Sequence, residues 1–158
     1  MFSAVVLAGE RPGGSPLSRA LGLKASVLID VAGKPALQRV IDALSGADQI
    51  NGGLLCGPAK SVFEDAPEFE RILAGTSFRW LEPEAGPSAS AIKAIKTLDQ
   101  YPLLLTTGDH ALLTPELVDT FCRHARAVGG DIVVGLTPYS IVHAAFPQSK
   151  RTVQKYSD

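Results

Sequence analysis

The chain has 158 residues, with 46% hydrophobic residues, 20% charged residues and a formal net charge of −1. This length and composition are typical of one globular domain with a sizeable core. The near-neutral charge excludes a nucleic-acid groove, and apolar runs of only four to six residues are too short for a membrane span. The two cysteines, Cys56 and Cys122, lack metal-ligand spacing, so we expect free buried thiols in a reducing, cytoplasmic compartment.

The first predicted element is a buried strand over 4–8, which ends at Gly9. A loop rich in Gly, Pro, Ser and Arg follows, reaches Lys24, and precedes a second apolar run over 27–31. Glycines let backbone N–H groups approach a ligand closely, and a lysine supplies a point charge suited to phosphate. The pattern favours a nucleoside triphosphate held over the end of a parallel sheet, and a long disordered surface loop is the alternative.

Helix and strand patterns alternate along the rest of the chain. In the helix that follows the 78–82 strand, the spacing predicts that Ile92, Ile95 and Leu98 face inward. Strands separated by helices of this length predict an α/β fold, a Rossmann-like doubly wound and mostly parallel sheet with helices on both faces. The predicted elements are a helix over 35–46, a strand over 50–56, a helical stretch over 61–74 broken near Pro67, a strand over 78–82, a helix over 88–99, a strand over 102–107, a helix from the Thr114 N-cap to Gly129, and a strand over 131–136.

Ligands of such sheets bind at the carboxyl ends of the strands, where Asp109 also lies. Asp109 is too far before Thr114 to cap the next helix. A carboxylate that faces a phosphate loop is suited to Mg²⁺, which prefers oxygen ligands and bridges phosphates. A solvated loop aspartate is the alternative. Arg11 and Arg19 flank the first loop and could contact phosphates, although arginines are common on surfaces.

A second loop, EAGPSAS over 84–90, joins the 78–82 strand to the next helix. Gly86 with Ser88 and Ser90 would lie at another strand carboxyl end and could line a base or ribose pocket. Turn chemistry with a serine N-cap explains one of these serines equally well.

These residues resemble the MobA-like (molybdenum-cofactor nucleotidyltransferase-like) family of NTP transferases. The family motif is LAGG, a Gly/Arg-rich loop, a Lys, a short strand, then G-K-P-L and a helix. The similarity runs through Leu7-Ala8-Gly9, Lys24 and Gly33-Lys34-Pro35, while Gly86-Pro87-Ser88 looks like the base-side turn and Gly108-Asp109 like the metal-binding strand end. The resemblance spans essentially the whole chain and implies a fold of the nucleotide-diphospho-sugar transferase type.

Relatives of this kind transfer a nucleotidyl group from an NTP to a phosphorylated acceptor, with Mg²⁺, and release pyrophosphate. The resemblance implies catalytic roles for Lys24 and Asp109, with Asp109 as the metal ligand. The alternatives are a catalytically inactive nucleotide-binding or regulatory module and a sugar-nucleotide-dependent glycosyltransferase, which would more typically carry a D-x-D where this chain has Asp109-His110-Ala111. The residues implied to bind nucleotide are Leu7, Ala8, Gly9, Arg19, Lys24, Gly86 and Ser88.

The sequence departs from the family pattern in the first loop and in length. Glu10 stands where the family usually has a second glycine, and LSRALG over 17–22 replaces the usual Arg-Met-Gly. Only 49 residues follow Asp109, so we expect one nucleotidyltransferase-like domain over 1–158 without its C-terminal acceptor-binding part, ending in a strand cut within 151–158. The 131–136 strand would then expose an apolar edge, which predicts a homodimer or poor order after Pro138.

Overall fold

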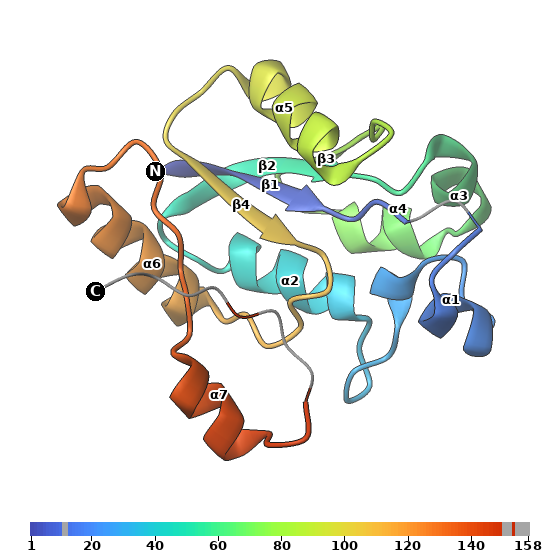
Figure 1. Cartoon of the computed structure of the whole chain (residues 1–158). Coiled ribbons are helices and arrows are strands. Elements are labelled where there is room, and N and C mark those ends of the chain that lie inside the picture. Colours follow the sequence, from blue (N-terminus) through green and yellow to red (C-terminus); the bar gives the residue numbers. More distant parts are fainter. Residues whose placement is uncertain (11–12, 150–152, 154–158) are drawn as a thin grey trace.

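Four parallel strands form one sheet in the order β3-β2-β1-β4 (Figure 1). This computed structural model describes residues 1–10, 13–149 and 153. The strand order reverses between β1 and β4, because β2 and β3 add to one side of β1 and β4 adds to the other. The doubly wound parallel sheet predicted from the sequence is confirmed. The strands are β1 (Phe2–Leu7), β2 (Ile50–Cys56), β3 (Phe78–Leu81) and β4 (Leu103–Thr107).

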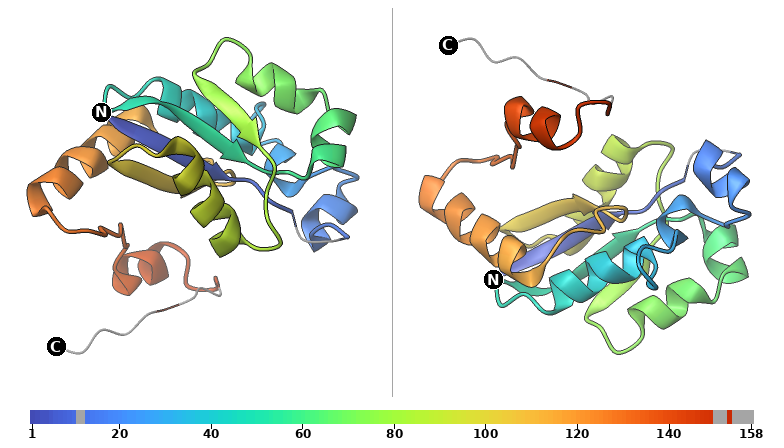
Figure 2. Two further views of the ribbon diagram at one scale, coloured as in Figure 1. Left: turned by 90° about the horizontal axis from the view of Figure 1, so that it is seen from above. Right: turned by 90° about the horizontal axis from the view of Figure 1, so that it is seen from below.

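Helices cover both faces of the sheet. Helix α5 packs on one face, and α2, α4 and α6 form a layer on the other (Figures 1 and 2). The larger apolar core lies between the sheet and this second layer, and a smaller cluster lies beneath α5. The helices are α1 (Pro16–Ala20), the 3₁₀ turn η1 (Ser26–Leu28), α2 (Ala36–Ser45), α3 (Lys60–Asp65), α4 (Glu68–Leu73), α5 (Pro87–Leu98), α6 (Pro115–Val128) and α7 (Tyr139–Ala145).

Helix α2 illustrates how the sequence pattern builds the core. Its four apolar residues at i, i+3, i+4 and i+7 are all fully buried, and the helix ends at Gly46, as predicted. Burial of each such side chain contributes about 1.5–3 kcal/mol. The Thr114 hydroxyl accepts a hydrogen bond from the Leu117 N–H at 3.2 Å and starts α6 at the predicted place. The four α2 residues are Leu37, Val40, Ile41 and Leu44.

Part of the loop after β1 forms a short helix, α1. The Ser15 hydroxyl accepts from the Ser18 N–H at 3.0 Å and the Ser18 hydroxyl accepts from the Ser15 N–H at 2.9 Å, a capping box that starts α1. The apolar run over 27–31, a short strand by resemblance, instead enters η1 and makes only the isolated bridge between Asp30 and Pro35. Arg11 lies outside the described residues.

The prediction of a strand over 131–136 is wrong. Three of its four branched apolar residues are largely exposed, Ile132 at 85%, Val134 at 66% and Leu136 at 61%, and Val133 is half-buried. Strand propensity is not sufficient, because a strand also needs a partner for its backbone N–H and C=O groups. Edge strand β4 pairs only with β1 within the described ranges. Helix α7 follows and buries none of its residues. In Figure 2 it lies apart from the sheet. Except for Val153, the end over 151–158 lies outside the described residues.

Helix α5 packs on the sheet through small residues and part of the predicted stripe. Leu98 packs against the smaller core cluster, as predicted, and Ile95 is half-buried. Ser90, Ala91 and Ala94 are buried, whereas Ile92 is 54% exposed, so its predicted inward orientation is wrong. Ile92 lies two positions from Ala94, about 200° around the helix. A face of small side chains therefore turns Ile92 outward.

Cys56 and Cys122 are both free and buried, as expected from their spacing. Burial raises the pKa of each thiol, so both stay neutral at neutral pH. Across the part of the chain that the structure describes, the helices are too short or too polar to cross a bilayer.

Candidate functional site

A cavity of about 330 Å³ lies at the carboxyl ends of the strands, at the point where strand order reverses. In open α/β sheets this is where ligands bind, because the loops on either side of the reversal separate and leave a crevice. Three of the loops predicted to carry function meet there. The lining residues are Leu7, Ala8, Gly9, Glu10, Ser26, Val27, Cys56, Pro83, Glu84, Ala85, Gly86, Pro87, Ser90, Thr107 and Asp109.

Backbone pairing continues past the strand ends and fixes the floor of this cavity. The Gly108 N–H donates to the Leu7 carbonyl at 2.8 Å, and the Ala8 N–H donates to the Cys56 carbonyl at 2.9 Å. A Cβ on Gly108 would lie 3.2 Å from side-chain atoms of Ala8, Val27 and Leu37, so the close packing at this position favours glycine. The chain then turns and presents Asp109, which is exposed and lines the cavity as predicted.

Of the two serines that could line a pocket in the β3–α5 loop, only Ser90 lines the cavity. Gly86 is the N-cap of α5 and no side chain caps the helix, so the serine cap expected from the sequence is wrong. Ser88 is exposed and does not line the cavity, whereas Ser90 lines it and is only 4% exposed. The Ser90 hydroxyl accepts from the Glu84 N–H at 2.9 Å and so holds the loop against the helix.

The two predicted cations of the first loop lie elsewhere. Lys24 forms an ion pair with Asp65 of α3, and both side chains are about 60% exposed, at 59% and 61%. The Arg19 guanidinium donates to the carbonyls of Gly13 and Gly14 at 3.0 and 2.9 Å, closing its own loop. Neither side chain lines the cavity.

The Gly33-Lys34-Pro35 segment forms a turn that is fixed by its own neighbours. The Gly33 N–H donates to an Asp30 carboxylate oxygen at 2.9 Å, and Lys34 pairs with Asp42 of α2 at 2.6 Å. Burial alone would raise the pKa of Asp42, but hydrogen bonds from Lys34 and Gln38 bring it below its ordinary value. This most specific part of the family motif therefore has a structural role in this chain.

Three carboxylates line the cavity: Glu10, Glu84 and Asp109. Among the described residues, the one ion pair that these carboxylates form joins Glu84 to Lys93, whose ammonium nitrogen is 2.9 Å from the carboxylate. No lysine, arginine or histidine belongs to the lining in the described ranges 1–10, 13–149 and 153. Glu10 and Ser26 were not predicted as site residues, and Glu10 stood out in the sequence only as a departure from the family pattern.

The oxygen-rich lining is chemically suited to a hard cation such as Mg²⁺. Within the described residues no group of three His, Cys, Asp or Glu side chains could hold a metal ion by itself. Mg²⁺ commonly takes one or two protein carboxylates and completes its shell with phosphates and water. Asp109 fits that mode as a single protein ligand.

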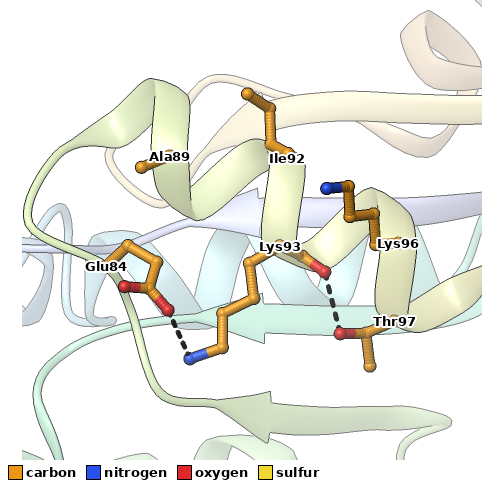
Figure 3. A pocket seen from close by; sticks show the side chains of 6 residues that line it. All are labelled: Glu84, Ala89, Ile92, Lys93, Lys96 and Thr97. Atoms are coloured by element: carbon orange, nitrogen blue, oxygen red, sulfur yellow. Dashed lines mark hydrogen bonds and ion pairs between the residues drawn. The ribbon is translucent and has the colours of Figure 1, made fainter.

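A second hollow of about 470 Å³ runs along the exposed side of α5 (Figure 3). Lys93 reaches from the helix to Glu84, which borders both hollows, while Ile92 and Lys96 lie along the helix. This groove contains none of the predicted site residues and lies on a helix face rather than at the strand ends. The strand-end cavity is therefore the candidate site.

A parallel doubly wound sheet with a cavity at its switch point defines an α/β domain of the nucleotide-diphospho-sugar transferase type. The chain belongs to the family of the MobA-like NTP transferase domain, whose model matches residues 4–154. This confirms the resemblance found in the sequence. Among curated proteins none matches the chain.

Solved structures support the fold. A hypothetical transferase from Thermus thermophilus matches with a TM-score of 0.63 and 23% identity over 96% of this chain and 57% of its own. A 4-diphosphocytidyl-2C-methyl-D-erythritol synthase from Anaerococcus prevotii gives a TM-score of 0.58 and 19% identity over 79% of this chain and 51% of its own. A CMP:2-keto-3-deoxy-manno-octonic acid synthetase complexed with CTP also gives 0.58, at 17% identity over 81% of this chain and 49% of its own. The chain thus spans about half the length of these structures.

Proposed function

We propose that this chain binds a nucleoside triphosphate and takes part in transferring its nucleotidyl group to a phosphorylated acceptor, with release of pyrophosphate. The observation that carries the proposal is the convergence of Leu7–Gly9, Gly86 and Asp109 on one cavity at the strand-order reversal. Membership of the NTP transferase family and the CTP complex of one structural neighbour support it.

In this proposal the backbone of Leu7–Gly9 positions the phosphates, and the loop around Gly86 and Ser90 faces the base and ribose. Asp109 would hold Mg²⁺, which when bound neutralises phosphate charge and orients the triphosphate. The protein's contribution is mainly positioning, because phosphoryl-type transfers between fixed groups need no covalent enzyme intermediate.

Pyrophosphate release tests the reaction directly. The chain is incubated with each of the four common NTPs and Mg²⁺, with a panel of phosphorylated sugars and alcohols, and pyrophosphate is measured. Acceptor-dependent release supports nucleotidyl transfer. NTP binding by calorimetry without release from any acceptor would support the second candidate, a nucleotide-binding module without transferase activity. Absence of NTP binding would overturn both.

The second candidate rests on the absence of cations from the lining. Within the described residues, the cavity presents Glu10 and no Lys or Arg, and Lys24 is engaged with Asp65. Positioned cations are a common means of stabilising charge during phosphoryl transfer. Binding without turnover would agree with this composition.

Lys24 is still expected to contact the triphosphate. An exposed ion pair such as Lys24–Asp65 contributes only about 0–1 kcal/mol, so a phosphate can compete for the lysine. A charge-assisted contact to phosphate is worth about 1.5–3 kcal/mol, so Lys24→Ala should weaken NTP binding roughly ten-fold or more at low salt. The control is Lys60→Ala, because Lys60 is also an exposed lysine and forms an ion pair with Glu64 within α3. An unchanged dissociation constant for Lys24→Ala would place this lysine outside the nucleotide site.

Strand β4 has no partner on its outer edge within the described ranges, which predicts self-association. No residue of β4 is charged, and its central residue Leu105 is 51% exposed. Unprotected strand edges pair with other edges, here with β4 of a second copy. We expect a concentration-dependent dimer in sedimentation experiments, and a return to monomer with Leu105→Lys. Leu112→Lys, at an 82% exposed position outside the strand, should leave the dimer intact. A wild-type monomer at all concentrations would contradict the prediction.

A further inference from the structure

Glu10 is the least expected residue of the cavity. It follows the Leu7–Gly9 backbone that the proposed function assigns to phosphate binding, and it lines the same cavity. Its side chain is half-buried. A carboxylate in this position brings negative charge to the place where a triphosphate would bring more.

The Glu10 carboxylate is also held in place. The Ser26 N–H donates to Glu10 Oε2 at 2.6 Å, which ties the loop after β1 to the start of η1. Both residues line the cavity, so this contact forms part of its wall. The Glu10 side chain can therefore move out of the cavity only if this hydrogen bond breaks.

Among the residues that the structure describes, few groups are free to neutralise this charge. Asp109 lies on the same cavity, and the Lys93 ammonium is engaged by the Glu84 carboxylate and the Glu82 carbonyl, each at 2.9 Å. Lys24 is paired with Asp65 on α3. In a partly enclosed site, like charges interact more strongly than in bulk water because solvent screening is reduced.

We propose that Glu10 makes nucleotide binding depend on a divalent cation by repelling a free triphosphate at the carboxyl end of β1. A cation that bridges the phosphates removes most of their charge and so most of the repulsion. Glu10 is thus a specificity-determining residue that selects the metal complex of the nucleotide over the free nucleotide. The proposal rests on the proposed function, since it assumes that the cavity takes a nucleoside triphosphate.

Glu10→Gln separates charge from structure. The amide oxygen still accepts from the Ser26 N–H, so the loop keeps its hydrogen bond while the charge is lost. Dissociation constants of ATP, GTP, CTP and UTP are measured by calorimetry for both proteins, in excess Mg²⁺ and in EDTA. We expect the ratio of the EDTA value to the Mg²⁺ value to fall about ten-fold or more in the variant, mainly through tighter binding in EDTA.

Glu64→Gln is the matched control, because it removes the same charge from an exposed α3 side chain outside the cavity. It should leave the ratio unchanged. An equal ratio in wild type and Glu10→Gln would overturn the role of Glu10 while leaving nucleotide binding established. A fall of the same size in Glu64→Gln would also overturn it, because the effect would then reflect net charge. Absence of binding by every protein in both conditions would overturn the proposed function, and this inference with it.

Discussion

Asp109→Ala is expected to weaken NTP binding in the presence of Mg²⁺ by about 100-fold, or about 2.7 kcal/mol. The reason is the position of Asp109 at the end of β4, on a cavity whose described lining contains no cation. The other two carboxylates of the lining are already engaged, because Glu10 accepts a hydrogen bond from the Ser26 N–H and Glu84 pairs with Lys93. Removal of the carboxylate should therefore reduce the difference between titrations in Mg²⁺ and in EDTA to the part that repulsion by Glu10 supplies.

The matched control for this prediction is Asp131→Ala, which removes an exposed carboxylate outside the cavity. Circular dichroism and thermal unfolding should be near wild type for both variants, since neither side chain is buried. If Asp109→Ala retains a wild-type Mg²⁺ effect on NTP affinity, Asp109 is a solvated loop residue and the metal assignment fails.

The sequence predicted the parts of the fold that depend on local pattern and on general rules for parallel sheets. The stripe of α2 identified a buried helix, and the alternation of strands with helices identified the doubly wound sheet. The meeting of Leu7–Gly9, Gly86 and Asp109 was also predictable. Carboxyl ends of parallel strands lie at one edge, so residues that follow those strands gather there.

Features that depend on distant partners were not predictable. Lys24 lies away from the cavity because Asp65, 41 residues further along the chain, engages it. The 131–136 run has strand composition but no partner strand in the described part of the chain. Only Ser90 of the two candidate serines lines the cavity, because α5 begins at Pro87 and residues two positions apart lie on different faces of a helix. Glu10 could be noticed in the sequence because it departs from the family pattern. The hydrogen bond that it accepts from the Ser26 N–H, 16 residues further along the chain, is evident only in the structure.

Gly57→Ala should destabilise the fold by about 2–5 kcal/mol, and it should also disturb the cavity. Gly57 has φ of +100° and follows β2 where that strand passes the loop after β1. A Cβ there would lie 2.6 Å from the Gly9 nitrogen and 2.8 Å from the Ala8 carbonyl carbon, both backbone atoms that cannot rotate away. The left-handed conformation contributes about 1–2 kcal/mol of the loss and the overlap about 1–3 kcal/mol.

Gly75→Ala separates these two contributions. Gly75 has a comparable φ of +74°, but a Cβ at that position would meet nothing within 4 Å. It should therefore lose only the conformational part, about 1–2 kcal/mol, and keep wild-type NTP affinity. Denaturant unfolding gives the free energies, and calorimetry of the folded fraction gives the affinities. Because Ala8 and Gly9 line the cavity, displacing them in Gly57→Ala should weaken NTP binding as well as the fold. Equal losses of stability in the two variants, with unchanged binding in both, would mean that the close approach of Gly57 to the first loop has no role in shaping the nucleotide site.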